Sequence, residues 1–214
     1  LKIFPFFTYV KNSLWVSGIT VILQAIVVPM AGYGFARKKF PLRNVLFLLV
    51  LATVMIPQQI TLIPLFGVFR SMGLLDSHTA LILPWVVAPF SIFIMRQAFI
   101  TLPGEFEDAA RIDGCSEFGL YWRIMFPLVK PAVVTISIFA FVQQWNELLW
   151  PVVLLKSPGL YTLPLGLTTL DSAFYGGWRQ SAAGAVLGII PTVIVFLLGQ
   201  KHFVRGLASG GVKG

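Results

Sequence analysis

The sequence has little charge and almost no cysteine. Only 11% of its 214 residues are charged, whereas 57% are hydrophobic, a composition outside the range of soluble globular domains. The single cysteine, Cys115, excludes an internal disulfide and any metal site built from cysteine ligands. This composition predicts an integral membrane protein.

The sequence also lacks the short motifs of common catalytic sites. It contains no GxxxxGK[ST] phosphate-binding loop, no HExxH and no GxSxG. Its two histidines, His78 and His202, lie at the edges of apolar runs, where they fit no nucleophile and base arrangement. We therefore predict no catalytic residue, no metal site and no cofactor, and a chain that cannot hydrolyse ATP by itself.

Long apolar runs are the main feature of the sequence. A transmembrane helix needs about 20 mostly apolar residues, and five runs reach this length. They cover residues 12–36, 44–69, 79–100, 127–155 and 181–203. We predict an all-α integral membrane protein in which residues 1–214 form a single transmembrane domain with five transmembrane helices.

Polar and proline residues punctuate the second run. Pro57 and Pro64 predict a kinked helix, because proline removes a backbone hydrogen bond. Gln58 and Gln59 place two amides in the same run. Such amides either bond to neighbouring helices or line a polar path, and the sequence favours neither over the other.

Two glycine-containing features are predicted near the end of the chain. Residues 156–180 read as an outer loop, with Pro158-Gly159 and Gly176-Gly177 as turn signals. In the last run, Gly184 and Gly188 are four residues apart, a spacing that lets another helix pack closely.

Residues 101–126 form a polar segment between two apolar runs. This segment holds five of the eight acidic residues: Glu105, Glu107, Asp108, Asp113 and Glu117. Acids near the start of a helix are stabilised by its dipole, so we predict a water-facing loop that is itself helical.

The turn signals within this loop predict a helix, a hinge and a second helix. Pro103 suits the first turn of the first helix. Asp113-Gly114 ends that helix, because glycine readily adopts the left-handed conformation found at helix C-termini. Ser116 then caps a second helix that runs towards Pro127.

One face of the first helix is predicted to dock a soluble partner. Phe106, Ala109, Ala110 and Asp113 share this face by their spacing. The two alanines keep the face shallow, so it can enter a groove on another protein.

The distribution of cations predicts the orientation. With the start of the chain outside and five crossings, eleven of the sixteen Lys and Arg residues fall on the inner side. These eleven are Arg37, Lys38, Lys39, Arg43, Arg96, Arg111, Arg123, Lys130, Lys201, Arg205 and Lys213. Cytoplasmic loops carry the excess of cations, so the 101–126 loop is predicted to face the cytoplasm.

A cluster of polar residues interrupts the fourth run. Its members are Gln143, Gln144, Trp145, Asn146 and Glu147. Amides and charges that face hydrocarbon are costly, so some of these side chains must face a cavity or a partner. Amides beside an aromatic ring suit a sugar, which offers hydroxyls to bond and an apolar face to stack. We predict that the cluster lines a solute path, with partner contacts an equal alternative for Glu147.

The polar loop carries a recognisable pattern. Asp108-Ala109-Ala110, three residues, Gly114, nine residues and then Ile124-Met125-Phe126-Pro127 resemble the EAA loop of binding-protein-dependent ABC importer permeases. Asp108 and Phe126 stand where that family has Glu and Leu, and both changes leave the helix, the hinge and the closing proline intact.

The resemblance covers nearly the whole chain and is closest to the carbohydrate branch, in particular the maltose-type and glycerol-phosphate-type permease subunits. The segments that carry it outside the loop are Gly32-Tyr33-Gly34-Phe35-Ala36-Arg37, Met55-Ile56-Pro57, Met72-Gly73-Leu74-Leu75-Asp76, Trp145-Asn146-Glu147, Trp150-Pro151 and Gly210-Gly211-Val212-Lys213-Gly214. It implies a sixth, N-terminal span and a bacterial or archaeal cytoplasmic membrane.

The resemblance also implies partners. It implies two cytoplasmic ABC ATPase subunits, a second permease subunit, related or identical, and an external solute-binding protein. The residues that would dock the ATPase are Glu105, Glu107, Asp108, Ala109, Ala110, Asp113 and Gly114. No nucleic-acid partner is predicted, because the basic residues form no continuous face.

Two other functions stay open at this stage. One is an ABC permease for a small polar solute other than a sugar. The other is an ion-coupled secondary transporter, which typically has repeated halves and acids at mid-depth in the membrane. Glu147 is the one candidate for such an acid, and it lies towards the outer face.

Overall fold

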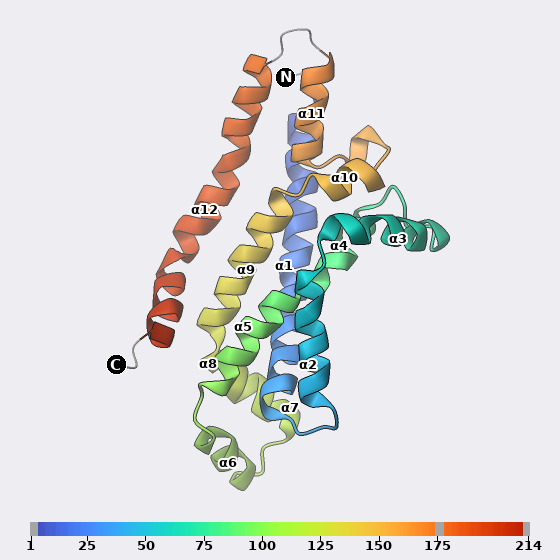
Figure 1. Ribbon diagram of the computed structural model, residues 1–214. Coiled ribbons are helices and arrows are strands. Elements are labelled where there is room, and N and C mark those ends of the chain that lie inside the picture. The colour runs from blue at the N-terminus through green and yellow to red at the C-terminus, as the bar shows by residue number, and fades with distance from the viewer. Residues whose placement is uncertain (1–3, 174–177, 212–214) are drawn as a thin grey trace. The chain divides into compact units, whose positions relative to one another are not determined.

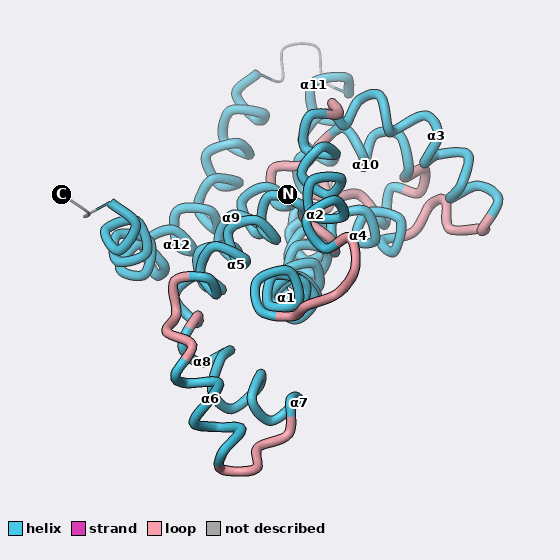
Figure 2. Tube along the Cα trace, turned by 60° about the horizontal axis from the view of Figure 1, so that its bottom comes forward, coloured by secondary structure: helices cyan, strands magenta, loops and turns pink. Residues whose placement is uncertain are grey.

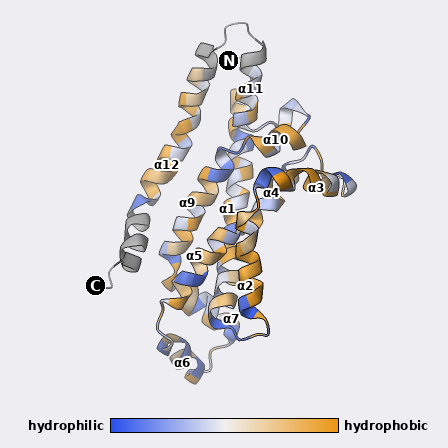
Figure 3. Cartoon of the chain, in the orientation of Figure 1, coloured by the Kyte–Doolittle hydropathy of each residue, from blue (hydrophilic) through white to orange (hydrophobic). Residues whose placement is uncertain are grey.

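The computed structural model describes the backbone of residues 4–173 and 178–211 and the side chains of residues 4–169 and 182–200. Within these ranges every regular element is a helix, and none is a strand (Figure 2). Apolar residues dominate the long helices, whereas α6 (Glu105–Ile112) carries hydrophilic ones (Figure 3). The predicted all-α membrane fold is confirmed.

The number of possible spans agrees with the prediction. Over the described ranges, three helical segments are long and apolar enough to cross a membrane: α1 (Phe6–Arg37), His78–Ile100 and Ala182–Gln200 (Figure 1). Two bent pairs of consecutive helices pass the same test together. These pairs are Arg43–Met55 with Gln58–Ser71, and Glu117–Leu128 with Lys130–Trp145. Counting each pair as one span gives up to five spans.

The second span is broken rather than kinked. It consists of α2 (Arg43–Ala52), the short 3-10 helix η1 (Thr53–Met55) and α3 (Gln58–Ser71). The break falls at Pro57, which has extended backbone angles and lacks the N–H that would continue the earlier helix. Pro64 lies inside α3 and does not end it.

The third span also has a proline at its interruption. α4 (His78–Val86) contains Pro84, and α5 (Pro89–Ile100) begins with a proline. Proline is well suited to a first helical turn, because the N–H that it lacks has no partner there. The break therefore separates two helices that are each well formed.

The fourth span is shorter than predicted. The sequence predicts one run over 127–155, but α9 (Lys130–Trp145) ends ten residues before that limit, and α10 (Leu149–Leu154) follows after a gap. In a continuous helix the Trp150 N–H would bond to the Asn146 carbonyl; here it donates to Glu147 Oε1 at 3.2 Å. This side-chain acceptor replaces the backbone one and starts the new helix.

The predicted outer loop contains helices. Residues 156–180 include the 3-10 turn η3 (Pro158–Leu160) and α11 (Leu163–Ala173), so the prediction of a plain loop is wrong. Leu163 and Leu165 are buried on α11 and give it an apolar face to pack. The turn predicted at Gly176-Gly177 lies outside the described residues.

The chain divides into two compact units. The first consists of Leu1–Leu23, Ile56–Val86 and Ile138–Leu198, with a core that includes Val16, Trp85, Trp150 and Leu154. Its polar side chains hold the turn before α11: Asn12 Nδ2 donates to the Gly159 and Tyr161 carbonyls at 2.8 and 3.0 Å. Ser13 Oγ accepts the Leu163 N–H at 2.7 Å, and His78 Nε2 lies 2.9 Å from the Leu160 carbonyl.

Glycines allow close packing within this unit. A Cβ on Gly184 would lie 2.3 Å from Leu167 Cδ2, and one on Gly188 would lie 3.5 Å from Leu163 Cδ2. Both leucines belong to α11, so the glycines of α12 (Trp178–Gly211) bring these two helices together. The close packing predicted from the four-residue spacing is confirmed.

The second unit consists of Gln24–Met55, Val87–Ser137 and Gly199–Gly214. Its core joins the later part of α1 with α2, α5 and the polar loop, through residues such as Val28, Phe47, Met95, Phe99 and Leu120. This unit contains the predicted docking helix. Its packing therefore decides how that helix is held.

Asp76 fixes the turn after α10 in the first unit. Its carboxylate accepts the Lys156 N–H at 2.8 Å, the Ser157 N–H at 2.9 Å and the Ser157 hydroxyl. The Ser157 hydroxyl and then the Ser157 and Lys156 N–H groups hold the pKa of this carboxyl below its ordinary value of 3.8. A lowered folded pKa means that the stabilisation is complete at neutral pH and is lost as the pH falls through the folded pKa.

We expect Asp76→Ala to free the Lys156 and Ser157 amides, and Asp76→Asn to free them less, because an amide oxygen can still accept hydrogen bonds. The measurement is hydrogen-exchange protection at neutral pH, which should fall severalfold at these two amides. The Leu163 amide is an internal control, because Ser13 holds it independently. Unchanged protection at Lys156 and Ser157 in Asp76→Ala would contradict the role of this carboxylate.

Candidate functional site

The predicted docking helix is present as α6, Glu105–Ile112. Gly104 is its N-cap residue and accepts the Glu107 and Asp108 N–H groups at 2.9 and 3.1 Å. Pro103 therefore lies just before the helix instead of in its first turn. Three acids occupy the first turn, where the helix dipole favours negative charge.

Gly114 ends this helix as predicted. Its φ of 75° is in the left-handed region, its N–H donates to the Arg111 carbonyl at 3.0 Å, and the Cys115 N–H donates to the Ala110 carbonyl at 2.9 Å. These two bonds form a Schellman motif, which satisfies carbonyls that the helix leaves free.

The second helix of the loop begins as predicted and then changes type. Ser116 Oγ accepts the Gly119 N–H at 3.2 Å and caps α7 (Glu117–Gly119). The chain continues through the π-helix η2 (Leu120–Met125) into α8 (Phe126–Leu128). The segment from Glu117 to Leu128 meets α9 at a bend of 76°.

The predicted docking residues divide between two faces. Five are exposed: Glu105, Asp108, Ala109, Asp113 and Gly114. Glu107 and Ala110, with 7% and 3% exposure, point into the second unit. The sequence placed Ala109 and Ala110 on one shallow face, whereas the structure exposes the first and buries the second.

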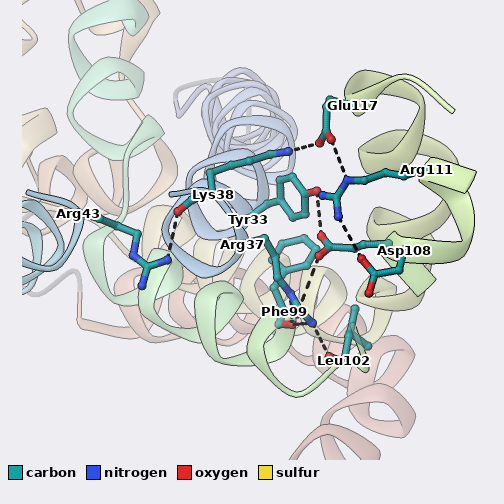
Figure 4. Close-up of polar contacts among 10 residues, drawn as sticks. Tyr33, Arg37, Lys38, Arg43, Phe99, Leu102, Asp108, Arg111 and Glu117 are labelled. Atoms are coloured by element: carbon teal, nitrogen blue, oxygen red, sulfur yellow. Dashed lines mark hydrogen bonds and ion pairs between the residues drawn. The ribbon is translucent and has the colours of Figure 1, made fainter. Parts of the chain in front are cut away.

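Glu107 bonds to the last turns of α1. The Tyr33 hydroxyl donates to Glu107 Oε1 at 3.0 Å, and Arg37 Nη1 lies 4.0 Å from Glu107 Oε2. Arg37 also donates to two backbone carbonyls, that of Phe99 in the last turn of α5 and that of Leu102 just after it (Figure 4). The buried acid therefore lies beside a buried hydroxyl and a partly buried guanidinium.

A second, exposed group of charges holds α7. Glu117 bonds to Lys38, the residue that follows α1, and accepts a hydrogen bond from Arg111 Nε at 3.0 Å (Figure 4). Arg111 also lies 3.4 Å from Asp108. The hydrogen bond from Lys38, and then that from Arg111, holds the pKa of the Glu117 carboxyl below its ordinary value. Exposed pairs such as these contribute little stability each, but they orient the loop.

Large apolar side chains lie exposed on this polar loop. Ile112 is 85% exposed, Phe118 72% and Phe106 45%. A hollow of about 560 Å³ lies beside Phe118, with Gly114, Cys115 and Trp122 also in its lining. Sequence reasoning included Phe106 but missed Ile112 and Phe118; the signal was available, since an apolar residue between polar neighbours in a water-facing loop needs a partner.

The predicted solute-path residues at the end of α9 divide in the same way. Gln143 and Asn146 are exposed. Gln144 and Trp145 are buried: Gln144 Nε2 donates to the Leu81 carbonyl at 3.2 Å, and Trp145 Nε1 donates to the Gly188 carbonyl at 2.9 Å. Glu147 is half-buried and starts α10.

Two further predicted path residues lie at a helix break. Gln58 and Gln59 are exposed in the first turn of α3, immediately after Pro57. Trp145 stacks on Phe141, with 5.6 Å between ring centroids. Four of the predicted path residues are thus exposed amides that a solute could reach: Gln58, Gln59, Gln143 and Asn146.

Helices long and apolar enough to span a membrane, with a polar helical loop between two of them, are the features of a membrane protein. Residues 6–209 match the family model described as binding-protein-dependent transport system inner membrane component. The chain belongs to this family.

Known relatives cover almost the whole chain. It is 43% identical to the arabinooligosaccharides transport system permease protein AraQ of Halalkalibacterium halodurans over 98% of this chain and 75% of that protein. It is 34% identical to the sn-glycerol-3-phosphate transport system permease protein UgpE of Yersinia pestis over 96% of this chain and 74% of that protein.

A solved structure is also similar. The fold resembles a chain of a bacterial ABC transporter involved in the import of the acidic polysaccharide alginate, with a TM-score of 0.81 and 28% identity. The likeness covers 92% of this chain and 75% of that one.

Proposed function

We propose that this chain is the permease subunit of an ATP-driven importer and forms the membrane pathway for a sugar or oligosaccharide. An external binding protein delivers the solute. This chain and a second permease subunit form the path together. Two ABC ATPase subunits hydrolyse ATP on the cytoplasmic side. The setting is a bacterial cytoplasmic membrane, because the relatives named above are bacterial proteins.

The observation that carries this proposal is the exposed face of the polar loop. Phe106, Ile112 and Phe118 leave apolar surface in water, next to exposed Glu105 and Asp108. Apolar anchors surrounded by charged groups are typical of protein docking surfaces. This face is the proposed contact with the ATPase, and family membership supports that choice of partner.

The sugar class rests on chemistry and on the relatives. The exposed Gln143 amide can donate to and accept from hydroxyls. Asn146 Nδ2 donates to the Val142 carbonyl at 2.7 Å, which leaves its second N–H and its Oδ1 for a hydroxyl. Of the relatives, AraQ is named for the transport of arabinooligosaccharides and UgpE for that of sn-glycerol-3-phosphate. An oligosaccharide requires many neutral hydrogen bonds, so amides suit it better than charged groups.

The test is reconstitution of the purified complex in lipid vesicles, with the second permease, the ATPase and the binding protein. Uptake of radiolabelled arabinooligosaccharides should require all four components and ATP. Uptake driven by an ion gradient without the ATPase would instead establish a secondary transporter. Uptake of a different small polar solute, with no response to sugars, would correct the solute class alone.

Gln143→Ala and Asn146→Ala are expected to lower sugar uptake about tenfold, because a site built to bond hydroxyls loses roughly 1–2 kcal/mol with each hydrogen bond. The ATPase activity stimulated by the binding protein should survive. Thr135→Ala serves as the control, since Thr135 lies on α9, is partly exposed, is not among the predicted path residues and bonds to its own helix at the Pro131 carbonyl. Uptake at the unmodified rate in both amide variants would remove them from the path.

A further inference from the structure

Glu107 is the acid of α6 that faces the protein instead of water. The other two acids of the first turn, Glu105 and Asp108, are exposed, whereas Glu107 is 7% exposed. A buried acid is costly unless it has partners. Tyr33 and Arg37 supply them, and both lie on α1, 74 and 70 residues earlier in the sequence.

The contact between α6 and α1 is narrow. On α6, Glu107 and Ala110 are buried, and the remaining side chains are exposed. An alanine presents only a methyl group. The longer Glu107 side chain therefore makes the polar contact between the two helices, because its carboxylate accepts a hydrogen bond from the Tyr33 hydroxyl at 3.0 Å.

Tyr33 cannot follow α6 without moving α1. Its ring packs edge-on against Phe99 at 5.3 Å between centroids and lies 5.2 Å from Tyr121. One residue earlier, the Gly32 backbone is so close to α5 that a Cβ there would lie 2.6 Å from Met95 Cβ. Tight packing transmits displacement instead of absorbing it.

Arg37 binds the backbone where the polar loop of residues 101–126 begins. Its Nε and Nη2 atoms donate to the Phe99 carbonyl at 3.1 and 2.7 Å, and Nη2 also bonds to the Leu102 carbonyl (Figure 4). One turn of α1 therefore binds both the start of the loop after α5 and the buried acid in the first turn of α6.

We propose that Glu107 is a positioning residue that passes displacement of α6 to the inner end of α1 through Tyr33. This inference rests on the proposed function, in which a partner presses on the exposed face of α6. Pressure on that face moves the buried face, and the hydrogen bond from Tyr33 carries the movement into a helix of 32 residues. Glu107 thus acts within the permease and not at the surface that docks the ATPase.

The experiment compares Tyr33→Phe, Glu107→Ala and Glu107→Gln in the complete reconstituted complex. Three quantities are measured: the amount of ATPase bound, the rate of sugar uptake and the ATP hydrolysed per sugar transported. We expect near-normal ATPase binding in Tyr33→Phe and Glu107→Ala, but about tenfold less uptake per ATP, the size of effect that a hydrogen bond to a charged group carries. Glu107→Gln should lose less, because its amide oxygen can still accept from Tyr33.

Tyr121→Phe is the matched control. Tyr121 belongs to the same aromatic cluster, and its buried hydroxyl has no hydrogen-bond partner among the residues whose side chains are described. Losing that hydroxyl should leave uptake per ATP unchanged. The double variant Tyr33→Phe with Glu107→Ala should be no worse than Glu107→Ala alone, since that substitution already removes the bond to Tyr33.

Two results would overturn the proposal. One is an unchanged ratio of uptake to ATP in Tyr33→Phe, and the other is a double variant in which the two losses multiply. Failure of the unmodified complex to bind an ATPase would count against the proposed function instead, so the two failures are distinguishable.

Discussion

Gly32→Ala is expected to destabilise the permease by about 2 kcal/mol or more, because overpacking a tight contact costs about 1–3 kcal/mol. The new Cβ would lie 2.6 Å from Met95 Cβ and 3.0 Å from the Arg96 nitrogen. These are atoms of the α5 backbone and its first side-chain carbon, so no rotamer change relieves the clash. Gly32→Val adds two more carbons at the same place and should prevent accumulation of the folded protein.

Gly34→Ala is the matched control for this substitution. Gly34 lies two residues further along α1, and nothing comes within 4 Å of a Cβ built there. Alanine in a helix is about 0.5–1 kcal/mol more stable than glycine, so this variant should be neutral or slightly stabilised. Thermal unfolding of the detergent-solubilised protein measures both. Equal midpoints for Gly32→Ala and Gly34→Ala would show that α1 and α5 are not in close contact.

Gly114→Val should leave the protein in the membrane but abolish productive docking of the ATPase. The φ of 75° at Gly114 is unfavourable for any residue with a Cβ, by roughly 1–2 kcal/mol, and a β-branched side chain is worse there. Restoring an allowed conformation would break the Schellman bonds to Ala110 and Arg111. Ile112 before the hinge and Phe118 after it would then lose the relative positions in which they form the docking surface.

Gly104→Ala is the control for the hinge. Gly104 flanks the other end of α6, has a φ of −69° and has open space around its Cβ position. It should therefore accept alanine with normal transport. The measurement is the amount of ATPase that co-purifies with each variant, where we expect at least a tenfold loss for Gly114→Val. Normal co-purification and transport in that variant would contradict the docking role of the loop.

Local signals predicted the polar loop well. Gly114 and Ser116 act on backbone groups within a few residues, so their type and position were enough to predict a hinge and a cap. The EAA-type spacing also predicts an ABC ATPase as the partner of this loop. The apolar runs likewise predicted the spans, since length and composition are properties of the sequence itself.

Contacts between distant residues could not be predicted in this way. Glu107 was read as one of several exposed acids, because its burial depends on Tyr33, 74 residues away. Trp145 was read as a stacking platform for a solute, although its indole bonds to Gly188, 43 residues later. Nothing in the periodicity of one segment records which other segment covers it.

The end of α9 is an intermediate case. Apolar residues resume after Glu147 and extend to Leu155, so the sequence predicts a single run of residues 127–155. Glu147 ends that continuity by accepting the Trp150 N–H, and Pro151 cannot supply an N–H of its own. An acid three residues before a backbone donor, followed by proline, is a helix-start pattern that hydropathy alone does not detect.

The bonds made by Asn12 bear on the biosynthesis of the chain. Its amide donates to the carbonyl of Gly159, 147 residues later. At about 5–20 residues per second, a ribosome needs roughly 7 to 30 s to make that stretch. Until Leu163 has been synthesised, the Asn12 amide and the Ser13 hydroxyl lack the partners that they have in the folded chain.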